Sequence, residues 1–209
     1  MRRIQNLMEQ WLFIGPDNRQ EQVNLPHTWN AKDGQDGGND YYRGICHYEK
    51  TFEKPEFDPE AEEVYLEFLG VNASSDVTVN GKELAHHDGG YSTFRINITE
   101  VLEDRNKLEG TGGHSVNGKV YPQKADFTFY GGIYRDVRFL IVSKEHFDLD
   151  YLGSNGIKIT PEVKENEANV HIETFTNTEE AQVNVQIKDQ DGKVVAEGNG
   201  CDVNLNIQN

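Results

Sequence analysis

Hydrophobic residues alternate with polar ones along most of this chain, with a period of two. The alternation is clearest over residues 64–69, 76–79, 93–98 and 134–142, which are also rich in β-branched and aromatic side chains. Successive side chains of a β-strand point to opposite faces of a sheet, so this pattern predicts half-buried strands. Asn80-Gly81, between two such runs, is a strong β-hairpin signal. Because no stretch has the period of a long amphipathic helix, we predict an all-β protein.

The alternation resumes in the second part of the chain, after apolar density falls at residues 143–151. The predicted strands there cover residues 157–162, 169–177, 182–188, 193–197 and 202–207. Asp191-Gly192 marks a hairpin turn between two of them. The fall in apolar density predicts a junction between two domains. We assign residues 1–145 to the first domain and residues 146–209 to the second.

Acidic residues outnumber basic ones, 36 against 20, so the formal net charge is −16. The acidic residues are spread along the chain, and the sequence has no basic stripe of the kind that binds nucleic acid. No segment has membrane-spanning length, and polar residues interrupt residues 1–11 too early for a signal peptide. We therefore predict a cytoplasmic chain, with neither nucleic acid nor a membrane as its partner.

The residues that commonly bind metals are poorly placed for a shared site. Cys46 and Cys201 are far apart and belong to no CxxC motif, which argues against structural zinc and against a disulfide framework. His86-His87-Asp88 resembles a ligand cluster, but neighbouring side chains of a strand point to opposite faces. We expect an exposed turn there, beside Gly89, and we predict no metal and no cofactor.

One loop combines aromatic and charged side chains at high density. It reads Tyr121-Pro-Gln-Lys-Ala-Asp126-Phe-Thr-Phe-Tyr130-Gly-Gly-Ile-Tyr134-Arg135 and leads directly into a predicted strand. Aromatic faces, together with charge-assisted hydrogen bonds from fixed carboxylates, are the contacts that bind sugars. The loop is therefore a candidate carbohydrate site. The alternative is an ordinary sandwich loop whose aromatic residues belong to the core.

Further motifs, in sequence order, accompany this loop over residues 11–142. They include Leu25-Pro-His-Thr-Trp29-Asn30, Tyr41-Tyr-Arg-Gly44, the strand pair around Asn80-Gly81, and Gly89-Gly-Tyr91-Ser-Thr-Phe94. Together they resemble the N-terminal sugar-binding domain of glycoside hydrolase family 2, the family of β-galactosidases, β-mannosidases and β-glucuronidases. The resemblance implies a jelly-roll β-sandwich of the galactose-binding type, followed by an immunoglobulin-like β-sandwich. The second domain is expected to be incomplete, since such a sandwich needs about seven strands and five are predicted.

The resemblance also implies which residues contact substrate. In the family's β-galactosidases an aspartate shortly before the Gly-Ile-aromatic-Arg segment touches the sugar, and the matching residue here is Asp126. An asparagine of the early loop makes a second contact; we choose Asn30, with Asn39 as the alternative. Lys124 is expected to line the same wall as Asp126, whereas Phe127 fits the core equally well.

Arg135 and Asp136 follow this loop at the head of a predicted strand. That position favours a structural role, in which the two residues tie loops together by an ion pair. We do not expect either of them to touch substrate.

The family's catalytic residues are glutamates on a (β/α)8 barrel, which needs about 250 residues of its own. The Asn-Glu pair of this sequence, Asn166-Glu167, lies in a polar turn between predicted strands and does not match a barrel acid. We therefore expect no catalytic residue here. The chain resembles the non-catalytic front part of a retaining glycoside hydrolase, and an independent carbohydrate-binding module is the alternative.

The partners implied by the resemblance are a β-galactoside or a related sugar, and the missing C-terminal barrel domain. Whether the parent protein is a homo-oligomer is left open. Galactose is favoured over glucuronate, because the Asp126 carboxylate would repel an acidic sugar unless a cation intervened.

Residues 107–119 depart from the family pattern, which has an alternating core strand ending in Val-Asp-Asn-Ser. Gly110, Gly112 and Gly113 make this stretch a poor strand. A natural loop insertion and a compensated pair of frameshifts are both compatible with the sequence. Reading the coding DNA in the shifted frame would decide between them.

Overall fold

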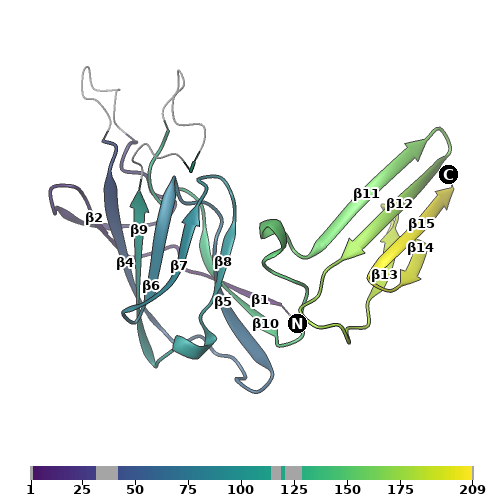
Figure 1. Ribbon diagram of the computed structural model, residues 1–209, viewed down its shortest axis with the longest axis horizontal. Coiled ribbons are helices and arrows are strands. Elements are labelled where there is room, and N and C mark those ends of the chain that lie inside the picture. Colours follow the sequence, from purple (N-terminus) through teal and green to yellow (C-terminus); the bar gives the residue numbers. More distant parts are fainter. Residues whose placement is uncertain (1, 32–41, 114–118, 121–128, 209) are drawn as a thin grey trace. The chain divides into compact units, whose positions relative to one another are not determined.

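The computed structural model of the protein describes residues 2–31, 42–113, 119–120 and 129–208. These residues form β-strands almost throughout, with short 3-10 helices at Thr99–Val101 and Tyr151–Gly153 (Figure 1). The predicted all-β class is therefore confirmed. Over the described ranges, the structure contains no helix long and apolar enough to span a membrane. The chain divides into two compact units, Met1–Ser143 and Lys144–Asn209.

Two antiparallel sheets make up the first unit (Figure 1). The larger sheet has the strand order β3-β2-β4-β9-β6-β7, and the smaller has the order β1-β10-β5-β8. The strands are β1 (Arg3–Asn6), β2 (Trp11–Ile14), β3 (Gln20–Val23), β4 (Ile45–Glu53), β5 (Glu62–Phe68), β6 (Ser74–Val79), β7 (Lys82–Asp88), β8 (Phe94–Asn97), β9 (Arg105–Gly113) and β10 (Val137–Ser143). The first and last strands of the unit, β1 and β10, lie side by side in the smaller sheet.

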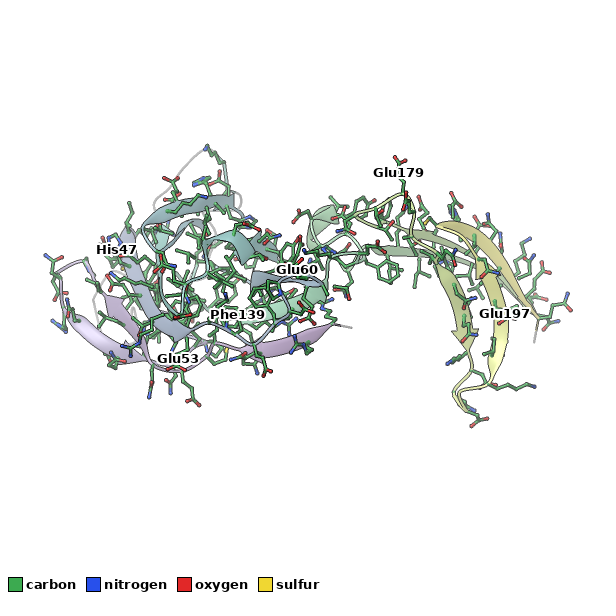
Figure 2. All side chains as sticks on the ribbon, turned by 90° about the horizontal axis from the view of Figure 1, so that it is seen from below. His47, Glu53, Glu60, Phe139, Glu179 and Glu197 are labelled. Carbon is green, nitrogen blue, oxygen red and sulfur yellow. The ribbon has the colours of Figure 1, made fainter. Side chains whose placement is uncertain are left out.

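The core of the first unit lies between its two sheets. Val64, Leu66 and Phe68 of β5 are buried, as their alternation predicts. Phe52 of β4 and Phe139 of β10 meet across the sandwich, with ring centroids 5.1 Å apart. Figure 2 shows Phe139 among the packed side chains of the unit. This two-layer packing is that of the predicted jelly-roll sandwich.

The glycine-rich stretch forms a central strand, contrary to the prediction of a poor one. β9 pairs with β4 along its whole length and with β6 over residues 108–113. A ladder is made by backbone N–H and C=O groups, so full strands on both sides can hold residues that lack side chains. The prediction of a poor strand is therefore wrong for residues 107–113, and residues 114–118 lie outside the described residues. The frameshift hypothesis concerns the coding DNA and stays a prediction.

The hairpin predicted at Asn80-Gly81 joins β6 to β7 and is confirmed. Asn80 and Gly81 have φ of 52° and 77°, as a two-residue type I′ turn requires. The Asn80 side-chain amide donates to the Val101 carbonyl at 2.8 Å, which fastens the turn to the unit. β7 extends to Asp88, so the His86-His87-Asp88 cluster lies on a strand and not in the exposed turn that we expected.

The second unit contains a three-stranded sheet of order β11-β12-β15 and a separate β13-β14 hairpin. Its strands are β11 (Ile157–Lys164), β12 (Glu167–Thr174), β13 (Asn184–Lys188), β14 (Val194–Asn199) and β15 (Asp202–Gln208), which confirms all five predicted strands. A small core forms where the two sheets pack, from Val170, Ile172 and Leu205 on one side and Val185, Ile187 and Ala196 on the other.

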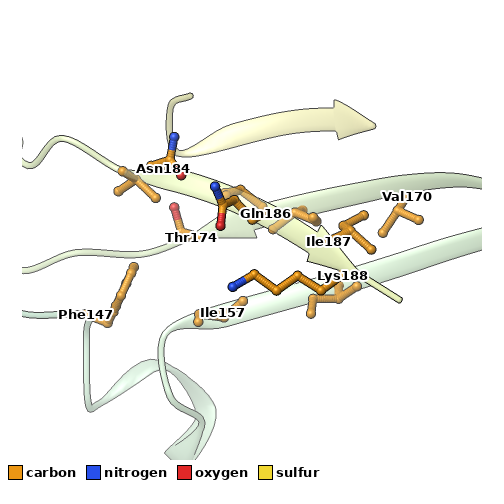
Figure 3. Close-up of a pocket in the computed structure, with 12 residues that line it drawn as sticks. Phe147, Ile157, Val170, Thr174, Asn184, Gln186, Ile187 and Lys188 are labelled. Carbon is orange, nitrogen blue, oxygen red and sulfur yellow. The ribbon is translucent and has the colours of Figure 1, made fainter. Parts of the chain in front are cut away.

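The β13-β14 hairpin leaves part of the three-stranded sheet uncovered. Ile157, Ile159 and Val163 of β11 are exposed, although they alternate like core residues. A groove of about 570 Å³, lined mainly by aliphatic side chains, lies between β11, β12 and β13 (Figure 3). An exposed apolar face of this kind is expected of a sandwich that lacks strands.

A buried carboxylate joins three strands of the smaller sheet. Glu67 of β5 has no exposed surface, and its cross-strand partners are Arg95 of β8 and Arg138 of β10. Arg95 Nε donates to Glu67 Oε1 at 2.7 Å, and Arg138 Nε donates to Oε2. Arg2 lies 3.6 Å from Oε1. Burying a carboxylate is costly unless its charge is paired and hydrogen-bonded, and both oxygens of Glu67 meet this condition.

We expect Glu67→Ala to lower the free energy of unfolding of the first unit by about 3–5 kcal/mol, because the buried Arg95 and the partly exposed Arg138 would lose their counter-charge. Chemical unfolding followed by circular dichroism measures the change. The matched control is Glu109→Ala, which removes a surface pair with Lys107 and should cost less than about 1 kcal/mol. Equal costs for the two variants would contradict the role given to Glu67.

Candidate functional site

Two distant segments meet at one end of the first unit, namely the loop after β3 and the loop before β10. The His27 N–H donates to the Ile133 carbonyl at 2.8 Å. His27 Nδ1 also shares a 2.7 Å hydrogen bond with the hydroxyl of Tyr48, a buried residue of β4. Gly132 has a φ of 119°, and a Cβ there would stand 2.6 Å from the His27 carbonyl oxygen. The contact therefore requires glycine at this position.

Trp29 is held between an aromatic ring and two glycines. Its indole stacks on Phe13, with centroids 6.2 Å apart and planes inclined by 17°. A Cβ on Gly131 would overlap the indole, and a Cβ on Gly112 would stand 3.4 Å from it. Gly112 belongs to β9. Glycine has a low propensity for strands, but at this position its missing side chain leaves room for Trp29. Trp29 Nε1 donates to the Tyr42 carbonyl at 3.3 Å.

Asn30 joins the early loop to the loop before β10. Its Nδ2 donates to the Tyr42 carbonyl at 3.1 Å, and its Oδ1 accepts from the Gly131 N–H at 2.8 Å. The residue is wholly buried. The direct sugar contact expected of Asn30 stays a prediction, and this burial does not favour it. The geometry instead makes Asn30 a positioning residue.

Asn72 makes an equivalent connection, which the sequence analysis missed. Its Nδ2 donates to the Tyr130 carbonyl at 2.8 Å, and its backbone N–H donates to the Gly132 carbonyl at 3.1 Å. A Cβ on Gly90 would overlap the Asn72 side-chain amide, so the backbone at residue 90 lies directly against it. The only sequence signal was an asparagine in the predicted turn after β5, a position where asparagine is common.

Tyr134 and Arg135 hold the loop that follows β7. The Tyr134 hydroxyl donates to the Gly90 carbonyl. Arg135 Nη1 donates to the carbonyls of Leu69 and Tyr91, at 3.3 and 3.2 Å. Arg135 thus ties loops together as expected, but it does so through carbonyl oxygens and not through the predicted ion pair.

The predicted substrate residues Asp126 and Lys124 lie outside the described residues, as do Phe127 and Asn39. The residues on either side of segment 121–128, Val120 and Phe129, are both buried. The Arg43 guanidinium carbon lies 5.9 Å from the centroid of the Phe129 ring. Phe129 directly precedes Tyr130, whose carbonyl accepts from Asn72, so the described chain resumes after this segment beside the loop cluster of Trp29 and Asn72.

Burial disfavours the charged forms of three titratable side chains near this end, namely His27, Tyr48 and Cys46. Burial lowers the pKa of His27 and raises that of Tyr48. Burial also raises the pKa of the Cys46 thiol to about 12, which makes this cysteine a poor nucleophile at neutral pH. Within the described ranges, no three His, Cys, Asp or Glu side chains are grouped to hold a metal ion.

We expect Gly131→Ala to displace the Trp29 indole and to destabilise the first unit by about 1–3 kcal/mol, because a methyl group is forced into a filled space. Gly110→Ala is the matched control, since a Cβ there meets nothing within 4 Å. The control should be neutral or stabilising by up to about 1 kcal/mol. Thermal unfolding and tryptophan fluorescence report both effects, and equal behaviour of the two variants would refute the packing argument.

The pKa values of three histidines of the first unit are expected to shift in different directions from that of a free histidine. Hydrogen bonds to Asp76, and then to Asp88, raise the pKa of His86, whereas burial lowers the pKa of His27 and His87. The contribution of His86 to stability is thus lost as pH rises through its raised pKa. His27 and His87 reduce stability as pH falls below the ordinary histidine pKa of about 6.5.

NMR titration of the imidazole signals measures the three values. Asp76→Asn should lower the pKa of His86 and leave that of His27 unchanged. A His86 that titrates at or below the value of a free histidine would contradict the assignment.

The amino-acid sequence matches a known family over residues 42–117, described as "Glycosyl hydrolase 2 galactose-binding domain-like". Among curated relatives, a β-glucuronidase of Bacteroides fragilis is 40% identical over 145 residues, which is 68% of this chain and 20% of the relative. A β-galactosidase of Thermoanaerobacter pseudethanolicus is 30% identical over 161 residues, which is 69% of this chain and 22% of the relative.

Solved structures show the same fold over the whole chain. An FMN-binding β-glucuronidase from Facaelibacterium prausnitzii L2-6 has a TM-score of 0.92 at 37% identity, and the match covers 100% of this chain and 34% of that one. A putative β-galactosidase from Bacteroides fragilis has a TM-score of 0.89 at 27% identity and is covered to 36%. The chain thus spans between a fifth and about a third of the length of these relatives. The first unit is the galactose-binding-like N-terminal domain of glycoside hydrolase family 2.

Proposed function

We propose that this chain is the non-catalytic N-terminal part of a retaining β-glycosidase of family 2. The observation that carries the proposal is the loop cluster in which Asn30, Asn72 and two glycines hold the backbone of residues 130–132, a few residues after Asp126 in the sequence. Its similarity to named β-glucuronidases and β-galactosidases, of which the matches cover between a fifth and about a third, supports the same reading.

In this proposal the chain binds the sugar and the barrel domain breaks the glycosidic bond. Retaining hydrolysis uses two carboxyl groups about 5–5.5 Å apart, one as nucleophile and one as acid and base. Both would come from the barrel. Asp126 would accept hydrogen bonds from sugar hydroxyls, each contributing about 1.5–3 kcal/mol because the acceptor is charged. The held backbone at Tyr130 and Gly131, shortly after Asp126 in the sequence, would lower the entropy cost of that contact.

The sugar itself is proposed only as a β-glucuronide or a β-galactoside. The sequence argument favours galactose, because the Asp126 carboxylate repels an acidic sugar. The relatives of higher identity are named β-glucuronidases, which favours glucuronate. Lys124, two residues before Asp126, is a cation that would offset the repulsion. We therefore propose that Lys124 binds the sugar carboxylate if the substrate is a glucuronide.

An independent carbohydrate-binding module is the weaker alternative. Its second unit would have to leave the apolar row of β11 exposed to water, at a cost in solubility. The cytoplasmic location and a homo-oligomeric parent remain proposals that rest on the sequence alone.

The test compares the 209-residue chain with the longer protein encoded at its locus, using 4-nitrophenyl β-glucuronide and 4-nitrophenyl β-galactoside. We expect turnover of one of them by the longer protein and none by the chain alone. Asp126→Asn in the longer protein should lower kcat/KM at least about tenfold. This corresponds to a loss of about 1.4 kcal/mol of transition-state stabilisation.

Asp191→Asn, in a hairpin turn of the second unit, is the control and should leave kcat/KM unchanged. The proposal fails if the longer protein cleaves neither substrate. It also fails if Asp126→Asn behaves like the control.

A further inference from the structure

Two exposed tyrosines emerge from the loops that the buried asparagines hold. Tyr91 is 53% exposed, although it follows the tightly packed Gly90. Tyr130 is 44% exposed, although it precedes the tightly packed Gly131. Neither ring belongs to the core of the first unit. The loop end therefore presents aromatic surface at positions whose backbone is fixed.

The backbone around Tyr130 is held on both sides of the residue. Its carbonyl accepts from Asn72 Nδ2 at 2.8 Å, and the following N–H, that of Gly131, donates to Asn30 Oδ1 at 2.8 Å. Both asparagines are buried. A buried amide that loses its partner costs about 1–3 kcal/mol, so neither contact is given up easily.

The backbone around Tyr91 is held in the same manner. The Gly90 carbonyl accepts from the Tyr134 hydroxyl, and the Tyr91 carbonyl accepts from Arg135 Nη1 at 3.2 Å. The Tyr91 ring packs against the Tyr134 ring in a T-shaped arrangement, with centroids 6.3 Å apart and planes inclined by 67°. This contact limits the orientations open to the exposed ring.

A single side chain links the two tyrosine-bearing loops. The Asn72 amide donates to the Tyr130 carbonyl, and the same amide fills the space that a Cβ on Gly90 would need. The backbone of residues 90 and 130 therefore lies on two sides of one amide group. Tyr91 and Tyr130 leave the domain from neighbouring points, although they are distant in sequence.

We propose that Tyr91 and Tyr130 form an aromatic platform that binds a pyranose ring of the carbohydrate ligand. A tyrosine offers an apolar face to the C–H side of a sugar and a hydroxyl to its polar edge. Its two side-chain torsions lose little entropy on binding, and the fixed backbone lowers the cost further. The platform would add affinity without touching the reacting bond, so it should act on KM more than on kcat. The inference rests on the proposed function only in taking the ligand to be a carbohydrate.

The experiment titrates the 209-residue chain with methyl β-D-glucuronide and methyl β-D-galactoside, followed by NMR. We expect at least one of them to bind with a Kd in the millimolar range, because most of the pocket is missing. Such a Kd corresponds to a binding free energy of about −4 kcal/mol. The double variant Tyr91→Leu/Tyr130→Leu removes both aromatic faces and should weaken binding at least about fivefold. Tyr91→Phe/Tyr130→Phe keeps the rings and should stay within about threefold of the parent chain.

Phe147→Leu, an exposed ring of the second unit, is the control and should bind as the parent chain does. Unchanged affinity of the leucine variant would overturn the platform. The platform would also be overturned if the leucine variants of the longer protein lost thermal stability while their KM stayed unchanged, because the rings would then pack against protein and not against sugar.

The outcomes separate this inference from the proposed function. Sugar binding through the tyrosines, with no turnover by the longer protein, would support the platform and refute the glycosidase. Turnover whose KM is insensitive to the leucine variants would support the glycosidase and overturn the platform.

Discussion

Hydrogen bonds to two buried asparagine amides hold the loop end of this domain, and the candidate site depends on them. Asn30 and Asn72 each bond backbone groups of the segment before β10, and both are removed from water. An amide inside a protein needs its hydrogen bonds, because losing one leaves a desolvated polar group. Moving the backbone at Tyr130 or Gly131 would therefore break a buried hydrogen bond. Two glycines hold the same segment in place by steric fit. A side chain at position 131 would collide with Trp29, and one at position 132 would collide with the His27 carbonyl.

The sandwich below supplies a rigid base for these loops. β9 runs through the centre of the larger sheet and brings Gly112 under Trp29, so sheet pairing and loop packing are coupled at one residue. On the smaller sheet, Glu67 holds β5, β8 and β10 together through paired arginines. Such buried pairs contribute little net stability, but they penalise any other register, because a shift would leave a charge unpaired.

The scaffold role proposed for this domain is consistent with a division of labour between domains. Burial keeps His27, Tyr48 and Cys46 in their neutral forms, which suits a scaffold better than a proton-transfer site. The chemistry proposed for the longer protein then lies on the barrel, and this domain contributes fixed hydrogen-bond acceptors and ring faces. Preorganisation is the contribution of such a scaffold, since a ligand contact made by a fixed loop carries a smaller entropy cost.

The sequence alone determined the features that depend on near neighbours. Alternation predicted β5, β6, β8 and β10 of the first unit and the five strands of the second, and Asn80-Gly81 predicted its hairpin, because side-chain period and turn geometry are local properties. Tertiary structure decided the rest. β9 is a strand because β4 and β6 flank it, not because of its own residues. Asn30 is buried because Gly131, 101 residues away, donates to its side chain. Neither Asn72 nor Glu67 is distinguished by its sequence neighbours, since the partners that define their roles come from distant loops for Asn72 and from other strands for Glu67.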